Sequence, residues 1–172
     1  MQPYTAVLAI SLFLAPTLSS ATTYYVSLTG SDSASCGQAT RPDSARRTIA
    51  AGLGCLSAGD TLYIRGGTYQ ESIDDTQVTI PSGTSWDNPV TIASAPGETA
   101  TLLGRVSIRD QPIQYVIFDR LTVDGGGSPN NTEQTFTVLQ FAFQSHLKFQ
   151  NGEIRNANDQ LITGGRAATC TS

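Results

Sequence analysis

The sequence predicts an all-β chain whose short strands stack as the coils of a parallel β-helix, or solenoid. Runs of Thr, Val, Ile and Tyr are punctuated by Gly, which favours strands separated by tight corners. Apolar residues alternate within each run, so each strand presents one apolar face. Similar runs recur at intervals of 26 and 31 residues, a spacing typical of stacked repeats.

The composition fits one domain of low charge. Charged residues make up 14% of the chain, against roughly 25% in an average globular protein. The net charge is only −4, and Lys148 is the single lysine. Such a balance indicates neither nucleic acid nor a membrane surface as a partner.

Residues 1–21 predict a secretory signal peptide. The apolar run Ala6–Ala15 is too short to span a bilayer, and Ser19 and Ala21 provide small residues at the spacing that a signal peptidase needs. We therefore expect a secreted, extracellular protein whose domain covers residues 22–172. No other stretch is apolar and long enough to cross a membrane.

Secretion permits disulfides and glycosylation. Cys36 and Cys55 flank a segment that can close as a loop, so we expect them to pair. Cys170 then has no partner, and we expect its partner beyond Ser172. Asn130 begins an Asn-Asn-Thr sequon in a turn-rich stretch and is the predicted glycosylation site.

One segment, residues 48–59, predicts a helix. Ile49, Leu53 and Leu56 form one apolar stripe, Thr48 can serve as N-cap, and Gly59 ends the segment. Two internal glycines each cost such a helix up to about 1 kcal/mol relative to Ala. We therefore expect packing to hold this helix as a lid over the first coil.

Four later runs predict strands with inward apolar pairs. We expect Leu62 and Ile64 to stack on Val90 and Ile92, and the offsets of 26 and 31 residues extend the stack to Val116 and Leu147. An antiparallel sandwich would also have short strands. Tight two-residue hairpin turns are missing from the sequence, which favours the solenoid.

The stretches "YYVSLTGSDSASCG", "RTIAAGLGCLSAGDTLYIRGGTYQESI" and "PVTIASAPGETATLLG" resemble the N-terminal portion of pectate-lyase-like right-handed parallel β-helix proteins. The resemblance runs from Thr23 to about Gly165. It implies a cap of one strand and a short helix, and a site on the outer face of middle coils. Because nothing after Gly165 resembles a C-terminal cap, we expect the chain to be a fragment.

That superfamily includes polyuronate lyases, polysaccharide hydrolases, epimerases and non-catalytic surface proteins, so the fold alone does not select an activity. A lyase needs a base to remove the proton α to a carboxylate, and the resemblance implies Ca²⁺ to neutralise that carboxylate. A hydrolase needs two facing carboxyl groups instead.

The 31-residue offset places candidate site residues on neighbouring coils. It stacks Lys148 over Ile117, Gln150 over Asp119, Glu153 over Thr122 and Arg155 over Asp124. Lys148 and Arg155 are the candidate catalytic bases; Asp124, Glu153 and Trp86 are the candidate substrate contacts. The alternatives are a surface ion pair for Asp124 and Arg155, a solvated side chain for Lys148, and an edge-covering ring for Trp86.

The sequence predicts no metal site. His146 is a single histidine without a second ligand at metal spacing, and we expect it to be structural. Asp74 and Asp75 supply two carboxylates, fewer than the six to eight oxygens that Ca²⁺ takes. We expect this pair to lie in an exposed polar loop.

The sequence thus predicts a secreted protein that acts on extracellular polysaccharide. A polyuronate lyase with its site largely outside this chain is the first hypothesis. A non-catalytic glycan-binding or structural solenoid is the alternative, and a hydrolase on the same scaffold is a third.

Overall fold

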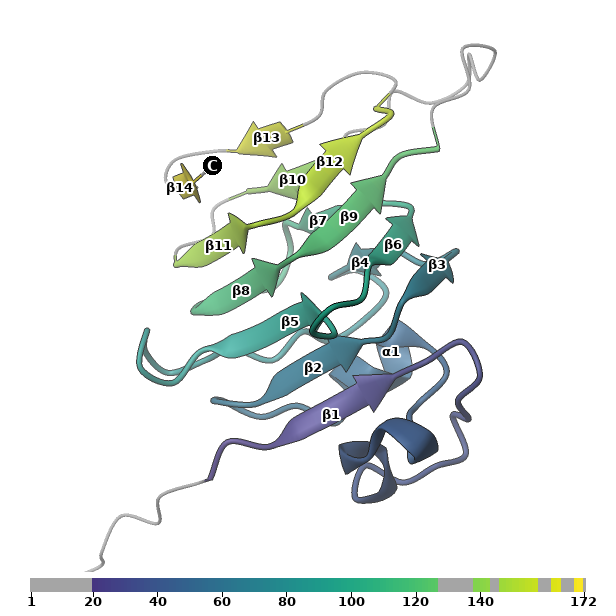
Figure 1. Ribbon diagram of the computed structural model, residues 1–172. Coiled ribbons are helices and arrows are strands. Elements are labelled where there is room, and N and C mark those ends of the chain that lie inside the picture. The colour runs from purple at the N-terminus through teal and green to yellow at the C-terminus, as the bar shows by residue number, and fades with distance from the viewer. Residues whose placement is uncertain (1–19, 127–137, 143–145, 158–161, 165–168, 172) are drawn as a thin grey trace, which may run out of the picture.

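The computed structural model describes residues 20–126, 138–142, 146–157, 162–164 and 169–171. Within these residues the named strands form three sheets, and every pairing between them is parallel (Figure 1). The all-β, parallel character predicted from the sequence is therefore confirmed.

The three sheets are defined by their strands in order of neighbours. The first sheet contains β1 (Thr23–Val26), β2 (Thr61–Ile64), β5 (Val90–Ser94), β8 (Val116–Asp119), β11 (Leu147–Gln150) and β14 (Thr169–Thr171). The second sheet contains β3 (Gly67–Tyr69), β6 (Ala100–Leu103), β9 (Leu121–Asp124) and β12 (Glu153–Arg155). The third sheet contains β4 (Ile73–Asp74), β7 (Val106–Ile108), β10 (Leu139–Phe141) and β13 (Ile162–Gly164).

Chain order passes through the sheets in rotation. Strands β2, β3 and β4 belong to the first, second and third sheets, and the same rotation repeats from β5, β8 and β11. We call each such set of three strands a coil. This arrangement is compatible with a parallel β-helix. None of the described strand pairs is an antiparallel hairpin, because every pairing is parallel.

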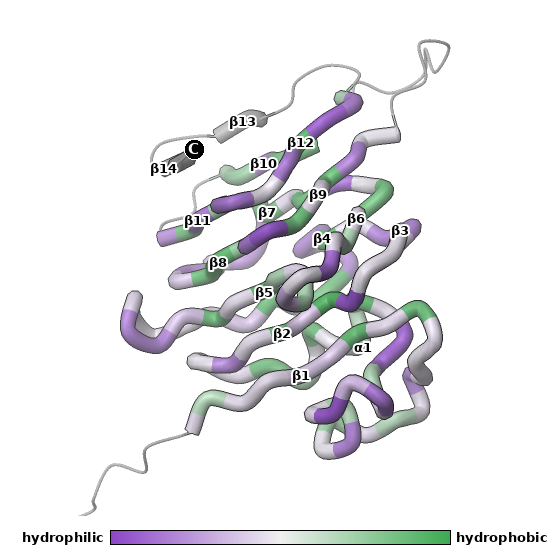
Figure 2. Tube along the Cα trace, viewed as in Figure 1, coloured by the Kyte–Doolittle hydropathy of each residue, from purple (hydrophilic) through white to green (hydrophobic). Residues whose placement is uncertain are grey.

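The apolar side chains of successive coils meet in the interior. Leu62 pairs with Ile92, Ile92 with Phe118, and Phe118 with Phe149. All four are buried, the first three completely. Figure 2 shows hydrophobic positions alternating with hydrophilic ones along the stacked strands. Burying each such side chain contributes roughly 1.5–3 kcal/mol, so this column stabilises the stacking of the coils.

One predicted register was wrong. Leu62 lies beside Ile92 and Ile64 beside Ser94, two residues further along β5 than expected. A shift of two residues keeps every side chain on its original face, so the alternation pattern cannot distinguish the two registers. The 26-residue offset from Val90 to Val116 and the 31-residue offset from Val116 to Leu147 are confirmed.

Helix α1 (Ile49–Leu53) is shorter than predicted. The Thr48 side chain accepts a hydrogen bond from the Ala51 amide, which confirms the N-cap, but the helix ends at Leu53 and not near Gly59. Gly52 explains why the helix packs so closely. A Cβ at this position would collide with Val26 Cγ2 and lie 2.9 Å from Leu62 Cδ1. The helix therefore covers the first coil as the expected lid.

Two short 3-10 helices complete the N-terminal cap. They are η1 (Gln38–Thr40) and η2 (Pro42–Ser44), and the sequence analysis missed both. The expected disulfide between Cys36 and Cys55 is present and joins this segment to the chain after α1. No helix in the described part of the chain is long and apolar enough to cross a membrane.

The corners between sheets use left-handed backbone. Asn151 has φ 54°, as its place in an Asn-Gly corner predicts, and Arg120 has φ 53° at the equivalent position of the preceding coil. Tyr115 (φ 53°) and His146 (φ 62°) form a second equivalent pair, each directly before a strand of the first sheet. The left-handed conformation costs a residue other than glycine roughly 1–2 kcal/mol, so the identity of these corner residues needs an explanation.

Candidate functional site

Four side chains gather where strands β5, β8 and β11 begin. The Trp86 and Tyr115 ring centroids lie 5.4 Å apart, edge to face, and the Tyr115 and His146 rings stack at 4.4 Å. Lys148 Nζ lies 3.8 Å from the centroid of the Trp86 ring. We call Trp86, Tyr115, His146 and Lys148 the Trp86 cluster. The strand starts that carry it follow the left edge of the molecule in Figure 1.

The corner conformations bring these rings together. Tyr115 and His146 occupy equivalent positions in successive coils, and the carbonyls of both residues accept hydrogen bonds from strand amides, Val90 to Tyr115 and Val116 to His146. Their stacked rings then stand one above the other on the outside of the corner. Backbone strain of this kind is typical of functional sites, where surrounding contacts hold a residue in place.

The loop that carries Trp86 is tied at both ends. The Gly83 amide donates to the Gln114 carbonyl at 3.0 Å, and the Gln114 amide donates to Ser82 Oγ at 3.1 Å. Asn88 Nδ2 donates to Thr84 Oγ1 at 2.9 Å across the loop. These bonds fix the loop that carries Trp86 before any ligand arrives, which reduces the entropy lost on binding.

The Trp86 cluster is open to solvent. Trp86 is 38% exposed, His146 is also exposed, and Tyr115 and Lys148 are half-buried. The cation–π contact of Lys148 contributes about 0.5–1 kcal/mol at such an exposed site. An indole offers an apolar face with a polar N–H edge. Lys148 Nζ covers one face of the indole, so a ring with apolar faces would pack against the rest of its exposed surface while the ammonium group of Lys148 donates hydrogen bonds beside it.

Sequence reasoning found half of this cluster. Trp86 was a candidate sugar platform or an edge-covering ring, and in the structure it is 38% exposed and also contacts Tyr115. Lys148 was a candidate base expected over Ile117, which is its partner in the structure, but its contact with Trp86 was not expected. Tyr115 was missed, and His146 was expected to be only structural. Both residues directly precede a strand of the first sheet and are 31 residues apart, so the repeat could have predicted that their side chains lie next to each other.

Asp124 and Arg155 form the predicted pair at another corner. Arg155 Nε donates to Asp124 Oδ2 at 2.8 Å, and Asn156 Nδ2 donates to Asp124 Oδ1 at 2.9 Å. The hydrogen bond from Asn156 is the main reason that the pKa of Asp124 lies below its usual value. Contact with Asp124 likewise raises the pKa of Arg155. The Gly126 amide also donates to Asp124 Oδ1 at 2.9 Å, so both oxygens of this carboxylate already accept hydrogen bonds from the protein.

Glu153 joins the same corner, where its carboxylate lies 3.4 Å from Arg155 Nη1. Its predicted register over Thr122 is confirmed. In Figure 1 the ends of β9 and β12 lie at the upper right, on the side opposite the starts of β8 and β11. The structure therefore does not bring Asp124, Glu153 and Arg155 into the Trp86 cluster.

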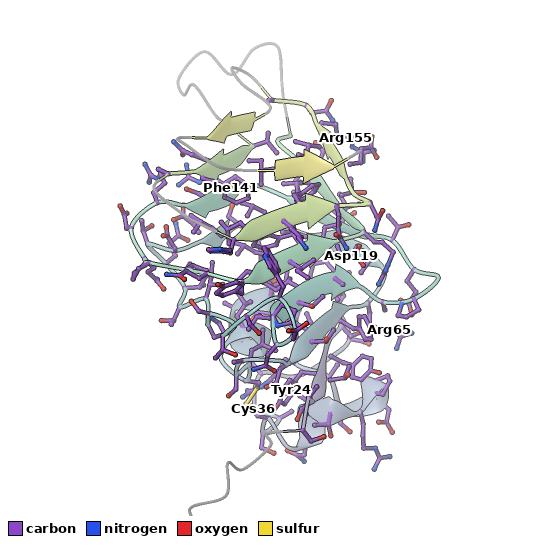
Figure 3. The ribbon with its side chains drawn as sticks, turned by 90° about the vertical axis from the view of Figure 1, so that its left-hand side faces the viewer. Tyr24, Cys36, Arg65, Asp119, Phe141 and Arg155 are labelled. Carbon is purple, nitrogen blue, oxygen red and sulfur yellow. A yellow bond between two sulfur atoms is a disulfide. The ribbon has the colours of Figure 1, made fainter. Side chains whose placement is uncertain are left out.

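A third polar group surrounds Asp119 at the end of β8. Its carboxylate pairs with Arg120 and accepts hydrogen bonds from Gln150 Nε2 at 3.3 Å and Asn151 Nδ2 at 2.8 Å. Figure 3 shows Asp119 and Arg155 on the same side of the molecule, with Arg65 below them. Asp119 is buried and satisfied by its neighbours, so it ties adjacent coils together.

Asp74 and Asp75 do not lie in an exposed loop, and that prediction was wrong. Asp74 has no exposed surface and Asp75 only 4%. Asp75 Oδ2 accepts the amides of Arg109, Asp110 and Gln111 at 2.7–2.8 Å. Pairing of β4 with β7 carries Asp74 inside, and the backbone amide of Asp75 donates to the Ser107 carbonyl of β7 directly after it. The polar composition of this stretch resembles that of a loop.

The described residues do not fit the Ca²⁺ that the resemblance implies. Within the ranges that the structure describes, no three His, Cys, Asp or Glu side chains gather as ligands. Asp74, Asp119 and Asp124 each pair with an arginine. Ca²⁺ takes six to eight oxygens, which these paired carboxylates do not supply.

Some predictions lie outside the described residues. These are the signal sequence over residues 1–19, the sequon at Asn130 and the side chain of Cys170. Comparison of the chain with protein-family models, curated proteins and solved structures found no match. The Trp86 cluster and the resemblance of the sequence motifs are therefore the observations that bear on function.

Proposed function

We propose that this is a secreted right-handed parallel β-helix protein of the pectate-lyase-like kind that binds an extracellular polysaccharide through the Trp86 cluster. The rotation of the chain through three parallel sheets supports the fold, and parallel crossovers are right-handed in about 98% of cases. The disulfide supports an oxidising compartment.

The exposed, pre-positioned indole of Trp86 is the observation that carries the binding proposal. A sugar ring has apolar C–H faces and a rim of hydroxyl groups, which matches an aromatic face bordered by hydrogen-bond donors. Lys148 Nζ lies over the indole ring and the His146 ring lies 6.0 Å from it between centroids, so two nitrogen-bearing side chains adjoin the exposed part of Trp86. The single lysine of the chain thus lies at the site where an acidic sugar would need a cation.

Trp86 also makes the proposal directly testable, because it is the only tryptophan. Adding pectic polysaccharide should change the intrinsic fluorescence in a saturable way. Trp86→Ala should then lower the affinity measured by calorimetry roughly tenfold or more, as truncation of a central aromatic anchor does. Leu103→Ala is the matched control, since Leu103 is also 38% exposed. Unchanged fluorescence, or equal losses in both variants, would refute the proposal.

Cleavage by β-elimination is the second candidate, favoured by the position of nitrogen bases beside the proposed platform. The base would take the proton α to a uronate carboxylate, the glycosidic C–O bond at the β carbon would break, and the leaving oxygen would gain a proton. Lys148 and Arg155 are the bases that the sequence predicts. His146, which the structure adds, lies 6.0 Å from Trp86 between ring centroids.

An ultraviolet assay of the unsaturated product from polygalacturonate, with and without added Ca²⁺, tests this second candidate. Lys148→Ala and His146→Ala should abolish product formation if the cluster performs the chemistry, whereas Arg155→Ala should leave it unchanged. Binding without any product would instead leave a non-catalytic glycan-binding module.

A further inference from the structure

The outward face of the first sheet carries a single in-register row that leads into the Trp86 cluster. Thr23 pairs with Thr61, Thr61 with Thr91, Thr91 with Ile117, and Ile117 with Lys148. All five side chains are half-buried, so the row is open along its length. Adjacent strands lie about 4.8 Å apart, which makes the row roughly 19 Å long.

The side chains of this row are of the kinds that bind sugars, namely hydroxyl groups and aromatic rings. Three threonine hydroxyls lie on neighbouring strands, and each can donate and accept hydrogen bonds. Tyr25 and Tyr63 lie one step further along the same strands, with ring centroids 5.9 Å apart. They give the row an aromatic border. The last member, Lys148, contacts Trp86 itself.

Charge is confined to one end of this row. The four members before Lys148 are uncharged. Asp119, the nearest carboxylate on the adjacent row, pairs with Arg120. A polyuronate with a carboxylate on every sugar would therefore meet one cationic side chain, Lys148, at one end of the row and no counter-charge among the other members of the row. Desolvating unpaired carboxylates there would cost free energy.

We infer that the first sheet binds a single polysaccharide chain along this row, and that the bound segment is mostly uncharged, with its acidic sugar at Lys148. This inference rests on the proposed binding at Trp86 and adds the track and the charge pattern of the ligand. Partly esterified polyuronate has that pattern, because esterification removes most of its charges.

Two polymers and two threonine variants test the inference. The probes are a highly methyl-esterified pectin of short chain length and the same preparation after complete saponification. The esterified probe should bind several-fold more tightly, by calorimetry and by Trp86 fluorescence. Thr61→Val should weaken its binding about fivefold, the loss expected for one hydrogen bond of about 1 kcal/mol. Thr68→Val is the matched control, because Thr68 is exposed on the second sheet.

The outcomes separate the two proposals. Equal or tighter binding of the saponified probe, with Trp86→Ala still harmful, would overturn the row and leave the Trp86 site standing. Equal effects of Thr61→Val and Thr68→Val would also overturn the row. Failure of both polymers to bind would overturn both proposals. Tyr63→Ala provides a second readout of the row, and its circular dichroism spectrum reports whether the variant is folded.

Discussion

Asp74 shows how a fully buried carboxylate is kept charged. Burial alone raises its pKa, but hydrogen bonds from Thr76 and from Arg105 outweigh burial and lower it below the ordinary value of 3.8. Thr76 Oγ1 donates at 2.7 Å and Arg105 Nε at 2.9 Å. The ionised form is thus stabilised only while its donors stay in place.

Arg105→Ala should therefore destabilise the protein strongly. It leaves the Asp74 carboxylate buried with a single side-chain donor, and breaking such pairs typically costs about 3–5 kcal/mol. Because Arg105 is 31% exposed, water reaches the site and we expect about 2–3 kcal/mol. Urea denaturation measures the change.

Arg155→Ala is the matched control for that experiment. Its pair with Asp124 lies on the surface, where an ion pair contributes at most about 1 kcal/mol. A loss for Arg105→Ala no larger than that for Arg155→Ala would contradict the burial argument.

The same carboxylate predicts a pH dependence. Because the folded-state pKa of Asp74 is lowered, its contribution to stability is present above the unfolded value of about 3.9 and is lost as pH falls through the folded-state pKa. Asp74→Asn should flatten the acid side of the curve of unfolding free energy against pH. A variant curve parallel to the wild-type curve below pH 4 would argue against this role.

At the scale of one element, helix propensity and core packing have opposite effects on the glycines of α1. Gly52 lies inside α1 and Gly54 is its C-cap, with right-handed helical backbone at φ −64°. Helix propensity favours Ala over Gly by up to about 1 kcal/mol in such backbone. Packing allows this gain at only one of the two glycines. A Cβ at Gly54 would lie 3.6 Å from the nearest atom, the Ala51 carbonyl oxygen, whereas a Cβ at Gly52 would collide with Val26 and Leu62 in the core.

Gly52→Ala should therefore destabilise the protein by about 1–3 kcal/mol, the usual cost of overpacking, despite its better helix propensity. Gly54→Ala should leave stability unchanged or raise it slightly. Thermal denaturation of the two variants beside the wild type measures whether each substitution lowers or raises stability. Equal effects would mean that α1 does not pack on the first coil as described.

At the scale of the molecule, every strand pairing in the described residues joins one coil to the next along the stack. In such an array stability is roughly a sum of coil and interface contributions. The Cys36–Cys55 disulfide, whose cysteines are 19 positions apart in sequence, anchors the cap at one end. A loss of stability at the cap should therefore affect the neighbouring coils more than the distant ones.

The double variant Cys36→Ala/Cys55→Ala should lose about 3 kcal/mol, as expected for a loop of this length. Amide hydrogen exchange should rise most in β1 and β2 and least in β8. Dithiothreitol added to the wild type should reproduce the pattern, and added to the variant should change nothing further. A uniform rise in exchange across all strands would contradict nearest-neighbour coupling.

The sequence predicted what depends on periodicity. Alternation and the 31-residue offset placed Lys148 over Ile117 and Arg155 over Asp124 correctly. The predicted register of β2 on β5 was wrong, because two registers that differ by two residues have the same alternation of apolar side chains, as for Leu62 beside Ile92. The predicted exposure of Asp74 was wrong because pairing with a strand distant in sequence buries this polar residue. Tyr115 was missed because left-handed corners are normally assigned to Gly and Asn, so an aromatic ring there gave no corner signal.

The unequal offsets between coils have a consequence for how this scaffold can change. Strands β8 and β11 keep perfect register although the chain between them is longer than between β5 and β8, and residues 125–138 separate β9 from β10 where residues 104–105 suffice one coil earlier. Extra length thus enters at a corner without altering the strands on either side. Because loop-closure entropy grows only logarithmically with length, new peptide segments inserted at this corner would cost little stability. The corner after β9 is therefore a natural graft point, at which recognition loops can be exchanged while the stacked strands stay constant.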